Sequence, residues 1–250
     1  MMVNKFALIT GSCHHRLGWH IAQALGKAGI QVGVHSRSRD AAVATVNQFK
    51  SEGGQAHAFS GDLADESQVE AIFQQIKQSW GRIDVLVNCA SVWESKPLEK
   101  TSAQDVRKHF EANILAPFLC ARAAGELMIL QPEGGCIINF GDWAESRPYP
   151  GYSAYFAVKG AIPAMTRSLA VEFALKNPTV RVNCILPGPV LFPDNLPAEE
   201  IQEAIAGTLL RRKGEPENIV QAVKYLMEND FVTGSSLVVD GGRSVWAGPG

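Results

Sequence analysis

The sequence lacks the features that mark secreted proteins, metalloproteins and membrane proteins. Its five cysteines are scattered and form no C-x-x-C pair, which is typical of reduced thiols in an intracellular protein. The six histidines show no H-E-x-x-H or other metal spacing, so we expect no metal. The first strand-like segment follows Met1 so closely that a signal peptide has no room, and no apolar run reaches the roughly 18 residues of a membrane span. We therefore expect a cytoplasmic protein with no membrane partner.

Charge of either sign is also scarce. Charged residues make up 19% of the 250 positions, the net charge is −2, and the two signs are mixed along the chain. Nucleic acid and anionic membrane surfaces are therefore not expected as partners. The apolar content of 46% suffices for one large core, and a doubly wound fold of this length often forms one domain. We predict a single domain over residues 1–250.

The chain does contain a regular alternation of strand-like and helix-like segments. Strands are predicted near residues 5–10, 31–35, 55–59, 83–88, 135–140, 180–186 and 236–240. Helices are predicted near residues 17–28, 40–52, 66–79, 103–130, 152–176, 198–206 and 216–228. This alternation predicts an α/β fold, namely a doubly wound Rossmann-type domain with a seven-stranded parallel sheet and helices on both faces.

One long irregular stretch, residues 187–200, interrupts this alternation. It follows the end of a predicted strand, and ligands bind at the carboxyl ends of strands in open parallel sheets. We interpret residues of about 187–207 as a substrate loop that acts as a lid. A plain surface loop is the alternative.

The first predicted strand runs into a glycine-containing turn. Gly11 follows the strand at once, and Gly18 lies where the next helix begins. Free backbone N–H groups and the helix dipole at such a turn favour an anion such as a phosphate. The turn is not G-x-G-x-x-G, because His15 and Arg16 lie where a middle glycine often occurs. Alone, the turn is a weak signal of nucleotide binding.

The end of the second predicted strand indicates which nucleotide would bind. Sites for NAD usually place an acid there to hold the ribose 2′-hydroxyl. Here the strand continues into His35, Ser36, Arg37, Ser38 and Arg39, and the first acid is Asp40, which is expected to cap the next helix. Arg37 with Ser36 or Ser38 could bind a 2′-phosphate, with Arg16 as a second candidate, so NADP(H) is the predicted cofactor. A basic, solvated loop is the alternative.

Tyr155 and Lys159 are four residues apart in a helical pattern. That spacing places both side chains on one face of a helix, with Cβ atoms about 5–6 Å apart. A phenol is a poor base at neutral pH, but a nearby ammonium group favours the phenolate and lowers its pKa. Such a pair can exchange a proton with a substrate oxygen. An ordinary pair on a helix surface has the same spacing.

Taken together, these motifs resemble the short-chain dehydrogenase/reductase family over nearly the whole chain. The resemblance rests on seven motifs in the same order: Thr10-Gly11 with Gly18, Gly61-Asp62-Leu63, Asn88-Cys89-Ala90-Ser91, Asn113, Tyr155 with Lys159, Pro187-Gly188, and Val239-Asp240-Gly241-Gly242. Two departures are similar to the pteridine reductases. The turn ends in Arg16-Leu17-Gly18, and Asp142 takes the place of the usual active-site serine. The turn is one residue longer than in those enzymes.

The resemblance implies roles for the residues of the site. Tyr155 would protonate the substrate anion, while Lys159 would lower the tyrosine pKa and bind the nicotinamide ribose. Asn113 would hold a water that links Lys159 to solvent, or else mark a helix kink. Asp142 would share a proton with Tyr155, or else be a turn residue. Further cofactor contacts would come from Asp62 (a helix-cap acid in the alternative), Leu63, Asn88, Ala90, Pro187 and Gly188.

Aromatic residues surround the implied substrate position. The predicted pocket consists of Ser91, Trp93, Trp143, Tyr149, Tyr152 and Phe192. Flat rings stack well on such side chains, which favours a pterin-like substrate. A general carbonyl or 3-oxoacyl reductase is the alternative, and a catalytically silent NADP(H)-binding sensor is a second. The resemblance also implies a homotetramer, or alternatively a dimer, with the helices near 103–130 and 152–176 packed between subunits.

Overall fold

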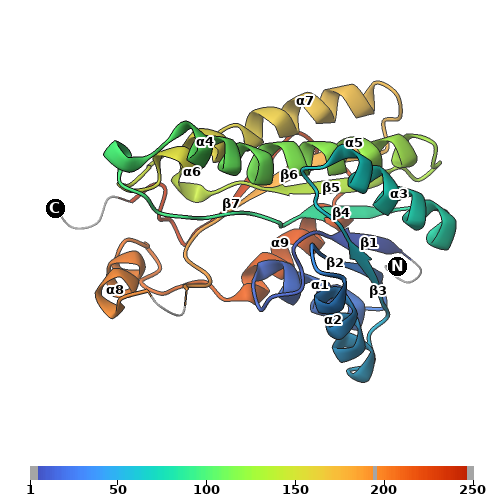
Figure 1. Ribbon diagram of the computed structural model, residues 1–250, viewed down its shortest axis with the longest axis horizontal. Coiled ribbons are helices and arrows are strands. Elements are labelled where there is room, and N and C mark those ends of the chain that lie inside the picture. The colour runs from blue at the N-terminus through green and yellow to red at the C-terminus, as the bar shows by residue number, and fades with distance from the viewer. Residues whose placement is uncertain (1–4, 194–195, 247–250) are drawn as a thin grey trace.

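The computed structural model describes residues 5–193 and 196–246, and within them seven parallel strands form one sheet (Figure 1). The strand order is β3-β2-β1-β4-β5-β6-β7, and the chain reverses direction across the sheet between β1 and β4. The strands are β1 Phe6–Ile9, β2 Gln31–Ser36, β3 Ala56–Ser60, β4 Val85–Asn88, β5 Gly135–Phe140, β6 Val180–Pro187 and β7 Ser236–Val239. The predicted fold class and all seven predicted strands are confirmed.

Helices cover both faces of this sheet (Figure 1). One layer contains α1 Leu17–Lys27, α2 Arg39–Ser51 and α9 Pro216–Glu228. The other contains α3 Glu66–Trp80, α4 Ala103–Phe110, α5 Ala116–Ile129, α6 Ser153–Lys159 and α7 Ile162–Ala174. Neighbouring strand residues point to opposite layers, so Ala7 and Ile9 pack with the first layer and Leu8 with the second. This two-sided burial is why the central strands are apolar throughout.

One predicted helix contains a π turn and another is broken, and a proline lies just after each irregularity. The predicted helix 103–130 contains a π turn, η2 Glu111–Leu115, before α5. Pro117 follows that turn and has no N–H to donate to the carbonyl of Asn113. The predicted helix 152–176 ends at Lys159 and resumes as α7, whose second residue is Pro163. Each proline removes the hydrogen bond that would continue the helix from the preceding turn.

The apolar faces of these helices serve mainly the core of this chain. On the two helices expected to pack between subunits, Leu119, Ile162 and Leu169 are buried within the protein, whereas Phe118 is 39% exposed. Other large apolar side chains are exposed on the same helices: Phe110, Val171 and Leu175. Ala103–Ile129 is long and apolar enough to span a membrane by length and composition alone, but half of its apolar window is buried in the protein. The homotetramer stays a prediction.

Candidate active site

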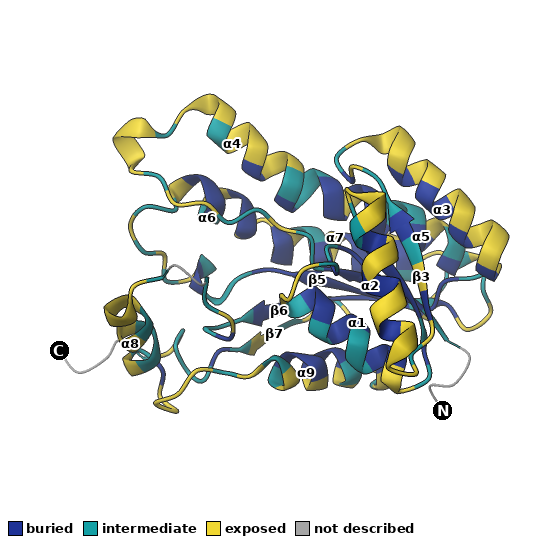
Figure 2. Cartoon of the chain, turned by 60° about the horizontal axis from the view of Figure 1, so that its bottom comes forward, coloured by how far each residue is buried: buried dark blue, intermediate teal, exposed yellow. Residues whose placement is uncertain are grey.

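A cavity of about 1820 Å³ opens at the carboxyl ends of the strands. Its far wall is the segment after β6, which leads into α8 Ala198–Ala206, a helix with no buried residue that stands away from the sheet (Figure 2). Most residues predicted for the site line this cavity: Gly11, His15, Arg16, Leu17, Gly18, Ser36, Arg37, Asp62, Leu63, Ala90, Ser91, Trp93, Asp142, Trp143, Tyr149, Tyr152, Tyr155, Lys159, Pro187, Gly188 and Phe192. Ser38, Asn88 and Asn113 do not. Residues 194–195 of the predicted loop lie outside the described residues.

The glycines of the first turn are required by its geometry. Gly11 has φ +63°, and a Cβ there would lie 2.8 Å from the Cα of Ala90. A Cβ on Gly18 would lie 2.9 Å from the carbonyl oxygen of Gly11. The Thr10 hydroxyl accepts the N–H groups of Cys89 and Ala90, each at 3.0 Å, and so ties the turn to the end of β4.

The amino end of α1 suits an anion. The helix begins at Leu17 with no side-chain cap and no acid in its first turn. Its first N–H groups therefore have no partner from a capping side chain, and the Arg16 cation lies beside them facing the cavity. These residues fit a phosphate group.

The end of β2 differs in detail from its prediction. Ser38, not Asp40, caps α2, and its hydroxyl accepts the N–H of Ala41 at 3.3 Å. Asp40 lies within the first turn of that helix. Because the Ser38 hydroxyl is engaged there and does not face the cavity, Ser36 and Arg37 remain as candidate phosphate ligands.

Asp62 faces the cavity and does not cap a helix. Its carboxylate accepts the N–H of Ala64 at 3.0 Å, and the helix that follows is capped by Asp65. The alternative reading of Asp62 as the cap of α3 is therefore wrong. One carboxylate oxygen orders the turn, and the residue lines the same part of the cleft as Leu63.

His35 is a structural residue of the cofactor end that the sequence prediction missed. The side chain is 2% exposed, and its Nδ1 accepts the N–H of Gly11 at 3.4 Å, while Nε2 lies 3.0 Å from the carbonyl oxygen of Gly61. These contacts require the neutral ring with its proton on Nε2. Burial lowers the pKa of His35 from 6.5 to about 4, although the Gly61 carbonyl and Asp62 oppose that shift.

We expect His35 to make the protein less stable in mild acid. The folded-state pKa lies below the unfolded value, so the unfolded chain binds more protons, and stability is full above pH 6.5 and falls towards pH 4. The loss reaches about 3 kcal/mol across that window. Urea unfolding at several pH values measures it, with His35→Gln as the matched variant. An equally steep pH dependence in His35→Gln would assign the effect to other groups.

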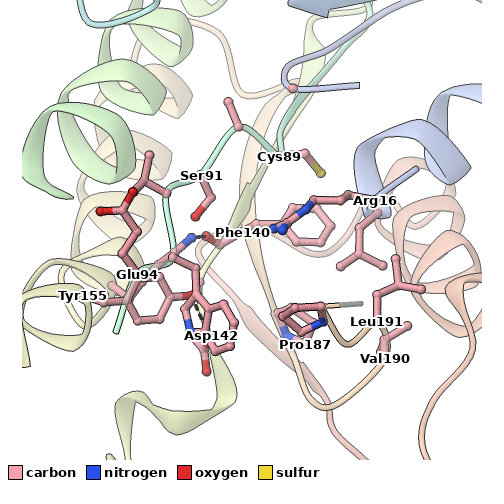
Figure 3. Close-up of a pocket in the computed structure, with 18 of the residues that line it drawn as sticks. Arg16, Cys89, Ser91, Glu94, Phe140, Asp142, Tyr155, Pro187, Val190 and Leu191 are labelled. Atoms are coloured by element: carbon pink, nitrogen blue, oxygen red, sulfur yellow. Dashed lines mark hydrogen bonds between the residues drawn. The ribbon is translucent and has the colours of Figure 1, made fainter. Parts of the chain in front are cut away.

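Tyr155 and Asp142 lie on the opposite side of the cavity from Arg16 (Figure 3), and Lys159 lies on α6 with Tyr155. The Tyr155 hydroxyl donates to Asp142 Oδ2 at 2.8 Å. The other carboxylate oxygen accepts the N–H of Ala144 at 2.8 Å, so Asp142 is both a turn residue and a partner of the tyrosine. Lys159 lies on the same face of α6 as Tyr155, with Nζ 5.8 Å from the centre of its ring, and donates to the carbonyl oxygen of Phe140 at 2.7 Å.

The pKa of Tyr155 shifts in the direction opposite to the prediction. Burial and the neighbouring Asp142 carboxylate raise it well above 10. Burial raises the pKa of Asp142 as well, and burial lowers the pKa of Lys159. The phenol is therefore protonated and donates to the Asp142 carboxylate, whereas the Lys159 ammonium group donates to the carbonyl of Phe140.

Two predicted asparagines hold the scaffold and do not line the cavity. The Asn113 carboxamide accepts from the Ser91 hydroxyl at 2.8 Å and the Val92 N–H at 3.0 Å, and donates to the Val92 carbonyl at 2.9 Å. It thus holds the loop after β4 against the π turn, which agrees with the kink interpretation. Asn88 is buried and donates to Asn139 at 2.9 Å and to the carbonyl of Pro117 at 3.2 Å, so its side chain holds the scaffold, and its cofactor contact stays a prediction.

Comparison with known proteins identifies the chain. The family model described as enoyl-(acyl carrier protein) reductase matches residues 13–244. The 3-oxoacyl-[acyl-carrier-protein] reductase of Homo sapiens is 34% identical over 228 residues, which cover 90% of this chain and 92% of that protein. The chain belongs to the short-chain dehydrogenase/reductase family. Cyclopentanol dehydrogenase from a Comamonas species is 33% identical over 245 residues and covers 96% of both chains.

A solved structure of this short-chain dehydrogenase/reductase family agrees over the whole fold. The gluconate 5-dehydrogenase of Burkholderia cenocepacia, determined in complex with NADP and tartrate, has a TM-score of 0.91 and 28% sequence identity, and the match covers 97% of this chain and 96% of that one. The membership makes the chain an oxidoreductase that binds a nicotinamide cofactor and acts on a small molecule. The finer resemblance to pteridine reductases stays a prediction.

The substrate end of this short-chain dehydrogenase/reductase is lined with aromatic rings that contact one another. Trp93 stacks on Tyr152 with ring centres 4.8 Å apart, and Tyr149 meets Tyr152 edge-on at 5.1 Å. Trp143 lies parallel to Tyr149 at 6.3 Å. The sequence prediction missed Arg147 and Arg243, which line the same end of the cavity. Arg243 lies in the segment after β7, and no spacing motif links it to the site.

Proposed function

We propose that the protein is an NADP(H)-dependent reductase of a small carbonyl compound, or the corresponding alcohol dehydrogenase. The observation that carries the proposal is the Tyr155 hydroxyl at 2.8 Å from Asp142, beside a buried Lys159 and open to the cavity. A catalytically silent NADP(H)-binding sensor would have no need for a protonated phenol that donates to an acid in the cavity. General carbonyl reduction fits the relatives, which include 3-oxoacyl and cyclic alcohol oxidoreductases.

The cavity has one site for each of the two phosphate-containing groups of NADP(H). Arg16 and the uncapped start of α1 would hold the pyrophosphate, and Arg37 with Ser36 would hold a 2′-phosphate. The first acid after β2 is Asp40, which lies on α2. The relative solved with NADP supports this choice of cofactor.

The residues of the chain divide the proton chemistry among them. When bound, the nicotinamide supplies or accepts a hydride at the substrate carbon. In reduction, the Tyr155 hydroxyl donates its proton to the substrate oxygen as negative charge develops there. Lys159 provides the positive charge that stabilises the resulting phenolate. Solvent then returns a proton to the tyrosine through Asp142, whose pKa is raised by burial so that its carboxyl can take up a proton and pass it on. The aromatic wall of Trp93, Tyr149 and Tyr152 excludes water from the reacting atoms.

The proposed function is tested by following NADPH oxidation with a panel of ketones, oxo acids, an acetoacetyl thioester, dihydrobiopterin and dihydrofolate. Reduction of at least one carbonyl compound, lost in Tyr155→Phe, is expected. A protein that binds NADPH and oxidises it with no member of the panel would instead fit the sensor.

Replacing Arg37 with alanine is expected to weaken NADPH binding and leave NADH binding nearly unchanged. The guanidinium group would lose a charge-assisted contact to the 2′-phosphate, which is worth about 1.5–3 kcal/mol. Fluorescence titration with both cofactors measures the effect. Arg39→Ala is the matched control, because Arg39 is an exposed arginine two residues further on that does not line the cavity. Equal affinity of the wild type for NADH and NADPH would contradict the assignment.

A second candidate substrate is a pterin, and Asp142 is the observation that favours it. A carboxyl group that shares a proton with Tyr155 can deliver it to a ring nitrogen, which a serine hydroxyl cannot do as readily. Against this, one face of Trp93 is covered by Tyr152, so at most its other face is open to a flat ring. General carbonyl reduction is therefore our first choice.

A further inference from the structure

Arg243 places a guanidinium group at the substrate end of the cavity. Its Cζ lies 4.6 Å from the centre of the Trp143 ring, and Nη1 donates to the carbonyl oxygen of Ala204 in α8. The stacking on Trp143 fixes the plane of the guanidinium group. Arg243 is also close enough to Asp142 for each charge to affect the pKa of the other group. Since Asp142 is bonded to the Tyr155 hydroxyl, Arg243 lies near the reacting position.

The charge on Arg243 is not matched by an acid among the described residues 5–193 and 196–246, where no ion pair to it occurs. Asp240 lies nearby, but its two oxygens accept the N–H groups of Gly242 at 2.8 Å and Ser244 at 2.6 Å. Asp142 is occupied by Tyr155 and Ala144. The acids of α8 that line the cavity, Glu200 and Glu203, form no ion pair with it either within those ranges.

A second cation reinforces the first. Arg147 lines the cavity and donates to the carbonyl oxygens of Arg243 and Trp246, and its charge acts on Arg243. Burial and the repulsion from Arg147 both lower the pKa of Arg243, whereas the nearby Tyr149 raises it. Two like charges held together in a half-buried cleft destabilise the protein unless an anion joins them. A bound anion would offset the repulsion between these two cations. The arrangement is therefore typical of an anion-binding site.

We propose that the substrate is a small oxo acid or hydroxy acid whose carboxylate is bound by Arg243. This inference rests on the proposed function and names the substrate class of the same site. An arginine fork matches a carboxylate in a two-bond geometry, and Arg243 lines the cavity while its Nη1 donates to Ala204. The carboxylate would orient the carbonyl carbon of the substrate, so that its oxygen meets the Tyr155 hydroxyl.

The reaction balances with the cofactor already proposed. The oxo acid accepts a hydride from NADPH at its carbonyl carbon, the C=O double bond becomes a C–O single bond, and Tyr155 supplies the proton to the oxygen. The products are the hydroxy acid and NADP⁺, and solvent returns the proton to the tyrosine. The carboxylate bound to Arg243 is unchanged throughout.

The inference is tested by binding, without turnover. The NADP⁺-loaded protein, which cannot reduce an oxo compound, is titrated by calorimetry with pyruvate and acetoacetate and with the neutral methyl ester of each. We expect at least one acid to bind about 10- to 100-fold more tightly than its ester, as a charge-assisted contact provides. Arg243→Met should abolish that preference, and Arg243→Lys should keep part of it.

Arg211 supplies a matched control. It also lies against a tryptophan, with Cζ 5.7 Å from the centre of the Trp246 ring, and it donates to an α8 carbonyl, that of Ala206, at 2.7 Å. It does not line the cavity. Arg211→Met should therefore keep the preference for the acid, and circular dichroism should show that each variant is folded.

The outcomes separate this inference from the proposed function. Acid and ester bound equally by the wild type, or a preference that survives in Arg243→Met, would overturn the carboxylate site even if NADPH oxidation with ketones is observed. A preference for the acid that depends on Arg243, without NADPH oxidation by any oxo compound, would uphold the site and overturn the proposed reaction. The same titration without nucleotide covers the case in which NADP⁺ does not bind.

Discussion

Tyr155→Phe is expected to lower turnover by about 10²–10⁴-fold and to leave cofactor binding nearly intact. The substitution removes the hydroxyl that donates to Asp142 at 2.8 Å and keeps the ring, which packs edge-on against Phe156 with centres 5.3 Å apart. Steady-state rates on the best substrate of the panel and a fluorescence titration with NADPH measure the two quantities.

Tyr225→Phe is the control for this substitution. Tyr225 lies on α9, is 46% exposed, and its hydroxyl accepts from Asn229 at 3.2 Å outside the cavity. The control should keep full activity. If the Tyr155→Phe protein turns over as fast as the wild type, the phenol is not the proton donor and the proposed chemistry is wrong.

Asp142→Ser is expected to separate the two substrate classes. Serine can hydrogen-bond a carbonyl oxygen, so ketone reduction should stay within about tenfold of the wild-type rate, whereas reduction of a dihydropterin should fall by about 10²–10⁴-fold. Both rates are measured on one preparation of the variant. An unchanged pterin rate, or no pterin rate in the wild type, leaves only the carbonyl reductase.

The same variant should also move the pH dependence of alcohol oxidation. Burial is the largest cause of the raised pKa of Tyr155, and the Asp142 charge is the second. Removing that charge lowers the tyrosine pKa, so the phenolate needed to accept the alcohol proton forms at lower pH. The rate of oxidation should therefore rise at a lower pH in Asp142→Ser than in the wild type. A shift towards higher pH would contradict the assigned coupling.

The fold could be predicted from the sequence because each helix and strand has a local sequence signal. Short apolar runs predicted the seven strands, and the apolar spacing of 3.6 residues predicted the helices. Most residues that line the cavity could also be predicted, because the carboxyl ends of parallel strands meet at one edge of the sheet, however far apart the strands lie along the chain. Gly11 was found from the turn after the first strand, and Tyr155 and Lys159 were found from their four-residue spacing on one helix.

The site features that were not predicted depend on tertiary contacts of side chains. Asn88 and Ser38 were predicted to contact the cofactor, but the amide nitrogen of Asn88 donates to Asn139 and the hydroxyl of Ser38 accepts from Ala41. The pKa of Tyr155 is raised first by burial and second by the Asp142 charge, and the four-residue spacing of Tyr155 and Lys159 reveals neither. Arg243 reaches the cavity through tertiary packing on Trp143, so no short motif could predict it.

The π turn Glu111–Leu115 limits how the length of the chain can vary. The π turn already holds one residue more than an α-helical turn, whereas a residue inserted or deleted in α4 or α5 beside it would rotate one side of the helix against the other by about 100°, because an α-helix turns by that angle per residue. Either His109, which meets the Tyr155 ring at 6.0 Å, or the face of α5 that packs on the sheet would then lose its partner. Insertions and deletions within α4 and α5 should thus be purged during divergence, whereas exposed turns such as 52–53 can absorb them.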